Sequence, residues 1–192
     1  IVFVDRYCPN VNADRVTTDN LGGAKRAVQY LVDRGHRRIA FFTDFATMTS
    51  AQDRLAGYKA GLEEAGIPYD ESIVCGPQIA RYGWWRLDFA LEHCLGLPEP
   101  ITAVFCMNDT SVLATLEAAE RLQVSIPGDL DMIGFFDDRF AHDIRTRFAR
   151  MKQSTLQMGQ LAAQLLMDRI DGKAPAGPQH IMLPAELVAE DS

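Results

Sequence analysis

The chain has 192 residues, of which 47% are hydrophobic and 23% are charged, proportions that are typical of a globular domain. Its formal net charge of -7 repels phosphate backbones, which argues against direct nucleic-acid binding by this part. No apolar run approaches the roughly 18 residues that a membrane-spanning helix needs. The first ten residues lack the basic start of a signal peptide. We therefore expect a cytoplasmic protein with no membrane partner.

The cysteines and histidines show no spacing typical of a metal site. None of the four cysteines forms a CxxC pair, and the four histidines are scattered along the chain. This pattern indicates reduced thiols, and we expect neither a metal nor a cofactor. The sequence also lacks the GxSxG, GxxxxGK[ST], GxGxxG and HExxH motifs. The chain is therefore not expected to be an enzyme.

After residue 20 the chain alternates between helical and extended patterns. Apolar residues at helical spacing predict four amphipathic helices, and Ser50 with Asp53 fits a capping box at the start of the second. Short apolar runs between the helices predict strands. The helices are expected from Asp19 or Asn20 to Gly35, from Ser50 to Gly66, and over 83–95 and 109–122; the strands are expected at 38–43, 72–75, 101–106 and 130–135.

Continuous apolar strands between amphipathic helices predict an α/β fold, in which helices cover both faces of a parallel sheet. The pattern changes near the end of the chain. Residues 148–154 are extended, 155–171 are helical, and two short strands are expected at 180–184 and 186–189. A late helix after the regular alternation predicts a second lobe that the chain reaches by crossing over.

In open α/β sheets, ligands bind beyond the carboxyl ends of the strands. The expected strand ends are rich in carboxylates, hydroxyls and an amide, a mixture that suits polyhydroxylated molecules better than phosphates. Some of these residues also have structural alternatives, because Asp109, or Asp137 with Asp138, could act as a cap, and Arg54 could pair with Asp53 on the surface. The residues at these ends are Asp5-Arg6, Thr18-Asp19, Thr43 to Ser50, Gly76 to Tyr82, Met107 to Asp109 and Phe136 to Asp138.

Several stretches, in order along the chain, resemble the effector-binding region of LacI/GalR-type bacterial transcriptional regulators. They include "VFVDR", "TTDNLGGAKRAVQYLVDRGHRRIAFF", "AQDRLAGYKAGLEEAGIPYD", "VSIPGDLDMIGFFD" and "KQSTLQMGQLAAQLLMDRIDG". The resemblance implies a type I periplasmic-binding-protein-like fold, with one near-complete C-terminal lobe and part of an N-terminal lobe. It implies that 1–18 and 148–177 belong to the N-terminal lobe, and 19–147 and 178–192 to the C-terminal lobe. The family's helix-turn-helix DNA-binding domain is expected outside this chain.

The resemblance also implies which residues contact an effector. By spacing, Phe136 falls at the position of the family's effector-binding aspartate, Asp137 matches the second aspartate of that motif, and Gln78 falls where an aromatic residue often stacks on a sugar. A ring in place of a carboxylate would change which molecule the site prefers. The expected effector-binding residues are Asp5, Ser50, Arg54, Asn108, Asp109, Phe136 and Asp137.

The function that the resemblance implies is that of a sensor domain. A small-molecule effector, expected to be sugar-like, would bind between the lobes and control the affinity of a repressor for operator DNA through the helix-turn-helix domain. The family forms homodimers through helices that correspond to 83–95 and 109–122, where Leu113 is either an interface residue or a core residue. The alternative is a solute-binding protein that delivers a sugar or a related small molecule to a transporter.

Overall fold

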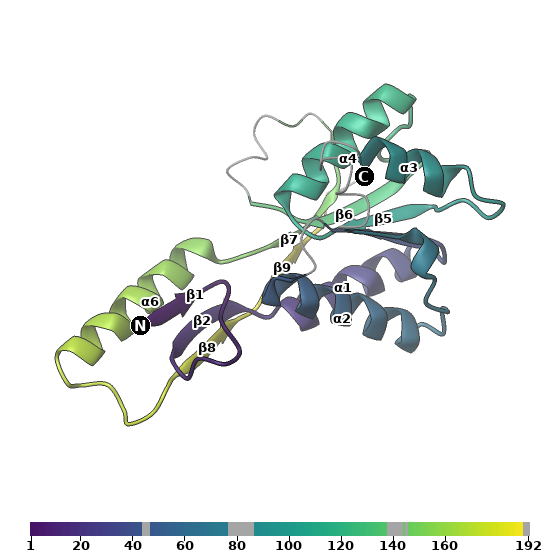
Figure 1. Ribbon diagram of the computed structural model, residues 1–192. Helices are drawn as coiled ribbons and strands as arrows, with labels where there is room; N and C mark the ends of the chain where they lie inside the picture. Colours follow the sequence, from purple (N-terminus) through teal and green to yellow (C-terminus); the bar gives the residue numbers. More distant parts are fainter. Residues whose placement is uncertain (44–46, 77–86, 138–143, 145, 190–192) are drawn as a thin grey trace.

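The computed structural model describes residues 1–43, 47–76, 87–137, 144 and 146–189, and it contains two mainly parallel sheets joined end to end (Figure 1). The sequence-based expectation of an α/β fold is confirmed. The small sheet has the order β1-β2-β8, in which all pairs are parallel, and the large sheet has the order β4-β3-β5-β6-β7-β9, in which only β9 is antiparallel to its neighbour. The strands are β1 (Val2–Val4), β2 (Asp14–Thr18), β3 (Ile39–Phe42), β4 (Val74–Cys75), β5 (Ala103–Cys106), β6 (Asp131–Phe135), β7 (Ala149–Lys152), β8 (His180–Leu183) and β9 (Glu186–Val188).

Helices cover both faces of the large sheet. One face packs against α1 and α2 and the opposite face against α3 and α4, so adjacent strand residues such as Phe41 and Phe42 enter different cores. This burial on both sides explains why the central strands are continuously apolar. The helices are α1 (Asn20–Asp33), α2 (Thr49–Glu64), α3 (Leu87–Leu95), α4 (Asp109–Leu122) and α6 (Thr155–Ile170), with a 3₁₀ turn at Glu71–Ile73.

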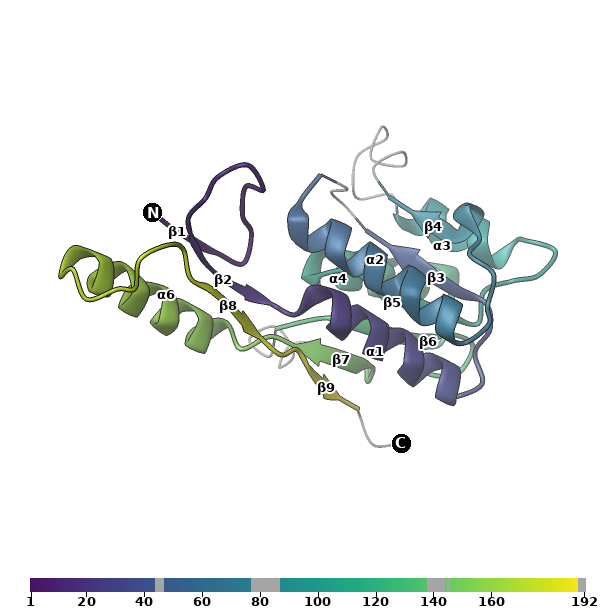
Figure 2. The ribbon, with the colours of Figure 1, turned by 90° about the horizontal axis from the view of Figure 1, so that it is seen from below.

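The small sheet is covered by α6, which packs through Met158 and Ala162 on Val16 of β2 and Leu183 of β8. Figure 2 shows α6 lying along this sheet, well apart from α1 and α2. The chain passes between the two sheets at three places: from β2 to α1, from β7 to α6, and from β8 to β9. We call these three places the crossovers.

Two of the expected lobe boundaries differ from the observed sheet pairing. Residues 148–152 were assigned to the N-terminal lobe, but β7 pairs with β6 in the large sheet, so this crossover follows Lys152. Residues 180–183 were assigned to the C-terminal lobe, but β8 pairs with β2, and the chain returns to the large sheet only after Leu183. The physical reason for the first difference is that Ala149 and Met151 are buried in the core beneath α1 and α2.

The expected capping box at the start of α2 is also wrong. The helix begins at Thr49, and its N-cap residue, Met48, makes no side-chain cap hydrogen bond. Ser50 is instead buried within the first turn. The start of the helix expected over 83–95 lies partly outside the described residues, and α3 is described from Leu87 onward.

An ion pair between Asp14 and Arg169 fastens α6 to the small sheet. Asp14 accepts hydrogen bonds from Arg169 Nε at 2.7 Å, Arg169 Nη2 at 2.8 Å and the Gln179 backbone N–H at 2.7 Å. The hydrogen bonds from Arg169 lower the pKa of Asp14 from 3.8 to about 2. Because the folded pKa lies below the unfolded value, the stabilisation is complete above pH 3.8 and is lost as the pH falls toward 2.

We therefore expect Asp14→Asn to lower the free energy of unfolding at pH 6 and to cost progressively less below about pH 4. Urea unfolding of the wild type and the variant between pH 6 and pH 3 measures this difference, and comparing the two proteins cancels the titration of other groups. A difference that stays constant across this range would mean that Asp14 has the same pKa in the folded and unfolded chains.

Candidate functional site

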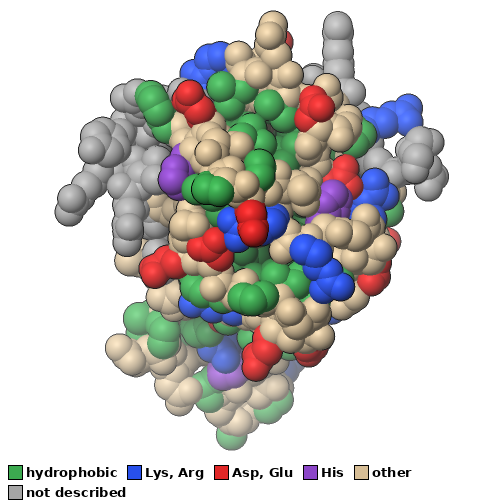
Figure 3. Space-filling model, turned by 90° about the vertical axis from the view of Figure 1, so that its right-hand side faces the viewer, with side chains coloured by type: hydrophobic (Ala, Val, Ile, Leu, Met, Phe, Trp, Pro, Cys, Tyr) green, Lys and Arg blue, Asp and Glu red, His purple; other side chains and the backbone are tan. Residues whose placement is uncertain are grey.

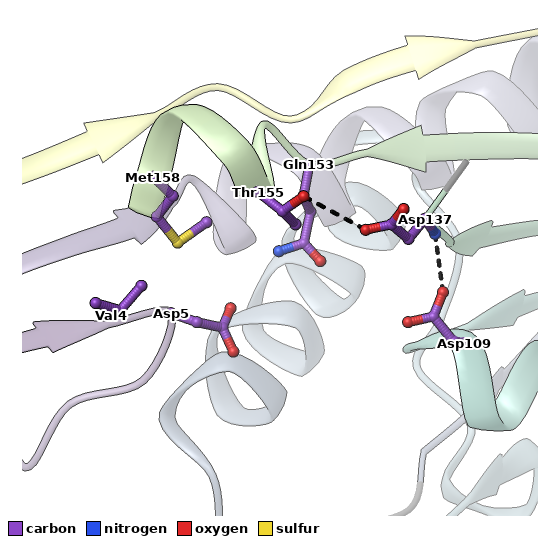
Figure 4. A pocket seen from close by; sticks show the side chains of 7 residues that line it. All are labelled: Val4, Asp5, Asp109, Asp137, Gln153, Thr155 and Met158. Carbon is purple, nitrogen blue, oxygen red and sulfur yellow. Dashed lines mark hydrogen bonds between the residues drawn. The ribbon is translucent and has the colours of Figure 1, made fainter. Parts of the chain in front are cut away.

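A pocket of about 320 Å³ lies where the carboxyl ends of strands from both sheets meet. Asp5 follows β1, Asp109 begins the helix after β5, Asp137 follows β6 and Gln153 follows β7. Parallel strands place their carboxyl ends at one edge of a sheet, which explains how residues far apart in sequence converge here. The lining residues are Val4, Asp5, Asp109, Asp137, Gln153, Thr155 and Met158 (Figure 4).

Two of the three carboxylates in the pocket lie close together. The backbone N–H of Asp137 donates to Asp109 Oδ1 at 2.8 Å, and the Thr155 hydroxyl donates to Asp137 Oδ2 at 3.4 Å. Burial raises the pKa of the Asp109 carboxyl, because removing it from water disfavours its charged form. Asp5 reaches the pocket from the opposite side, from a residue with φ of +65°. The pocket therefore presents hydrogen-bond acceptors from both lobes.

Arg54 extends from α2 toward the pocket residue Gln153 and is buried, with 4% of its surface exposed. Its guanidinium donates to Asn20 Oδ1 at 2.8 Å, to the Met107 carbonyl oxygen, and to Gln153 Oε1 at 3.1 Å. It also lies over the Phe135 ring at 3.7 Å from the centroid. The alternative in which Arg54 is a surface residue is wrong. Arg54 lies behind Gln153, which lines the pocket.

Asn108 caps α4. Its side-chain oxygen accepts from the Ser111 backbone N–H at 2.9 Å, and the Ser111 hydroxyl accepts from the Asn108 backbone N–H at 3.0 Å. The N-cap of α4 is therefore Asn108, and the alternative in which Asp109 is the N-cap is wrong. Of the expected effector-binding residues, Asp5, Asp109 and Asp137 line the pocket, whereas Ser50, Arg54 and Asn108 do not.

Phe136, which is expected at the effector position, is not among the residues that line this pocket. Its side chain is 2% exposed and packs edge-on against Phe148, with 5.5 Å between the ring centroids. Side chains alternate across the sheet, so Phe135 enters the core beneath α1 and α2, and Phe136 enters the core beneath α3 and α4. Asp137 is then the first residue beyond the strand that is able to face the pocket.

The sequence did not suggest Val4, Gln153, Thr155 or Met158 as lining residues. Gln153 carried a usable signal, because it follows β7 directly and so lies at a carboxyl strand end. It was missed because the whole of 148–154 was assigned to the other lobe. Thr155 and Met158 line the pocket because α6 lies beside it, and no sequence pattern predicts where α6 lies. Gln78 and Asp138 lie outside the described residues.

The described residues contain no group of three or more His, Cys, Asp or Glu side chains arranged to hold a metal ion. Within the same residues, no helix has both the length and the apolar character that crossing a membrane requires. On the face shown in Figure 3, acidic and basic side chains are interspersed with hydrophobic ones.

Leu113 on α4 is 44% exposed, so the alternative in which it is a core residue is wrong.

Comparisons with known proteins agree with this architecture. A model of the periplasmic binding protein-like domain matches residues 28–192. The HTH-type transcriptional regulator CelR of Thermobifida fusca is 32% identical over 187 residues, which make up 96% of this chain and 53% of that protein. A solved CelR–cellobiose complex has a TM-score of 0.84 at 29% identity, covering 98% of this chain and 57% of that one.

A regulatory protein of the LacI family from Chloroflexus aggregans has a TM-score of 0.86 at 27% identity, covering 98% of this chain and 66% of that one. The chain spans about half the length of the curated relatives it matches. The chain therefore belongs to the periplasmic binding protein-like domain family, and the curated relatives that it matches are transcriptional regulators.

Proposed function

We propose that this chain is the effector-binding domain of a LacI-type transcriptional regulator and that its pocket binds a small sugar-like molecule. The observation that carries the proposal is the convergence of Asp5, Asp109, Asp137 and Gln153 on one pocket between the two sheets. Carboxylates accept hydrogen bonds and an amide both donates and accepts, so together they match the hydroxyl groups of a sugar. The similarity to a regulator solved with cellobiose supports this class of effector.

The pocket is formed by both lobes, so an occupant contacts both sides of the crossovers. Such a molecule binds best to one relative arrangement of the lobes and shifts the population toward it. In the whole regulator, this shift would change the affinity of the helix-turn-helix domain for operator DNA. The regulator names of the matched relatives favour this reading over a solute-binding protein for transport, and no catalytic turnover of the effector is expected.

The experiment that tests the pocket is a thermal-shift screen with mono- and disaccharides, including cellobiose, and with nucleosides. A true effector raises the melting temperature of the wild type, because it binds only the folded state. We expect Asp137→Asn to raise the dissociation constant of the effector by roughly 10- to 100-fold, since a hydroxyl group of the bound effector loses a charged acceptor.

The control for that experiment is Asp33→Asn, an exposed aspartate at the end of α1 that does not line the pocket. This variant should bind with wild-type affinity. Isothermal titration calorimetry compares the three proteins directly. The proposal fails if no compound in the panel stabilises the wild type, or if both variants weaken binding equally.

We also propose that the chain forms a homodimer through α3 and α4. These helices pack against each other and carry exposed apolar side chains, with Phe89 46% and Leu113 44% exposed. A charge placed in an apolar interface opposes association, so Leu113→Asp should shift the protein toward monomer in sedimentation-velocity runs at micromolar concentration. Leu156→Asp serves as the control, because Leu156 is an exposed residue of α6 outside the proposed interface. A wild-type monomer under these conditions would contradict the proposal.

A further inference from the structure

Among the described residues that line the pocket, Gln153 alone has a side chain that connects two crossovers by hydrogen bonds. It follows β7 at the crossover to α6. Its Nε2 donates to the hydroxyl of Thr18 at 3.0 Å, and Thr18 is the last residue of β2 before the crossover to α1. Its Oε1 accepts from Arg54 at 3.1 Å. One amide therefore links the first crossover, the second crossover and the core of the large lobe.

The orientation of this amide is determined by its partners. A guanidinium group only donates hydrogen bonds, so the amide oxygen must face Arg54 and the NH₂ group must face Thr18. An amide oxygen accepts two hydrogen bonds and an NH₂ group donates two. These two contacts therefore use half of the amide's capacity, and a molecule in the pocket can hydrogen-bond to Gln153 without breaking either link.

Arg54 makes this link rigid on the large-lobe side. It is buried on the Phe135 ring and also donates to Asn20, which begins α1 directly after the first crossover. Thr18 and Asn20 are each 3% exposed, whereas Gln153 is partly buried because it forms part of the pocket wall. The two crossovers are thus connected by partly buried hydrogen bonds that pass through Gln153.

Resting on the proposed function, we propose that Gln153 is the positioning residue through which occupancy of the pocket controls the crossovers between the lobes. A hydroxyl group bound to Gln153 restrains its amide and strengthens its hold on Thr18. Binding in the pocket then stiffens the segment before α1, although the occupant does not touch Thr18, which does not line the pocket.

The link can be tested without any effector, by hydrogen–deuterium exchange of the backbone amides in 16–20 and 152–158. The variants are Thr18→Val, Gln153→Met and the double replacement. Each single replacement should raise exchange in both segments by about fivefold, and the Thr18 replacement should add little once Gln153 is replaced. Effects that multiply in the double variant, or that stay within the segment that carries the replacement, would overturn the link.

The chain offers matched controls for both replacements. Thr17→Val changes the neighbouring residue of β2, which is only partly buried, and Gln157→Met changes an exposed glutamine of α6. Both controls should leave exchange in the two segments at the wild-type rate. Equal effects of Thr17→Val and Thr18→Val would mean that the strand end responds to any loss of a hydroxyl group.

The second arm adds saturating cellobiose to the same proteins. In the wild type, cellobiose should slow exchange in both segments. In Thr18→Val it should still slow exchange in 152–158, because the pocket is intact, but protection of 16–20 should be lost. Equal protection of 16–20 in both proteins would overturn the inference. If cellobiose fails to bind the wild type, cellobiose is excluded as the effector, while the ligand-free arm still decides whether Gln153 links the crossovers.

Discussion

Phe136→Asp is expected to lower the free energy of unfolding by about 5 kcal/mol, enough to unfold the chain at room temperature. The Phe136 side chain is 2% exposed and packs on Phe148 in the core beneath α3 and α4. An aspartate there loses the contacts of a large ring and also buries a carboxylate. Circular dichroism without urea checks this result: the wild type should give the spectrum of a folded α/β protein, and the variant should be soluble but unfolded.

Two further variants separate this explanation from a role in effector binding. Phe136→Met keeps the position apolar and should cost about 1.5 kcal/mol, since methionine fills irregular space. Asp137→Asn changes the next residue, which lines the pocket, and should affect binding far more than stability. A folded Phe136→Asp protein with wild-type stability and an altered effector preference would contradict the structure and restore the register expected from the family.

Phe136 also shows how far local sequence patterns lead. The run of two phenylalanines followed by acids predicts a buried strand with carboxylates beyond its end; the buried strand is observed, and Asp137 beyond it lines the pocket. Comparison with a family motif places Phe136 at an effector position. In the structure both faces of the strand are buried, and each phenylalanine enters its own core.

The order of helices and strands was predictable because amphipathic and continuously apolar segments alternate along the chain. The sheets that β7 and β8 join could not be predicted, because short strands carry little information on their pairing partners. Arg169 illustrates the difficulty: it pairs with Asp14, 155 positions away, and so helps to hold α6 on the small sheet. Such contacts depend on the assembled lobes and leave no periodic signal in the sequence.

The positions of polar residues at the pocket were half predictable for a related reason. The rule that ligands gather at carboxyl strand ends identified Asp5, Asp109 and Asp137, all of which line the pocket. The rule does not say which way a side chain turns when the backbone offers a competing partner. Asn108 turns back to cap α4, and Arg54 turns inward to Asn20.

The inward turn of Arg54 leads to the second large effect. Arg54→Ala is expected to lower the free energy of unfolding by about 4 kcal/mol, because three acceptors lose their donor and the Phe135 ring loses the guanidinium that covers it. Urea unfolding measures this loss. Arg37→Ala is the matched control, since that exposed arginine donates a hydrogen bond to the Ala65 carbonyl oxygen on the surface, and it should cost less than about 1 kcal/mol.

Because Arg54→Ala weakens the fold, a lost thermal shift in this variant would not identify a ligand contact. Calorimetry at a temperature where the variant is still folded separates the two roles. If Arg54 acts through Gln153, the Arg54 variant loses much stability and only part of its affinity for an effector, whereas Asp137→Asn loses affinity and little stability. An Arg54→Ala protein as stable as the wild type, but unable to bind, would mean that the guanidinium turns toward the effector in the bound state.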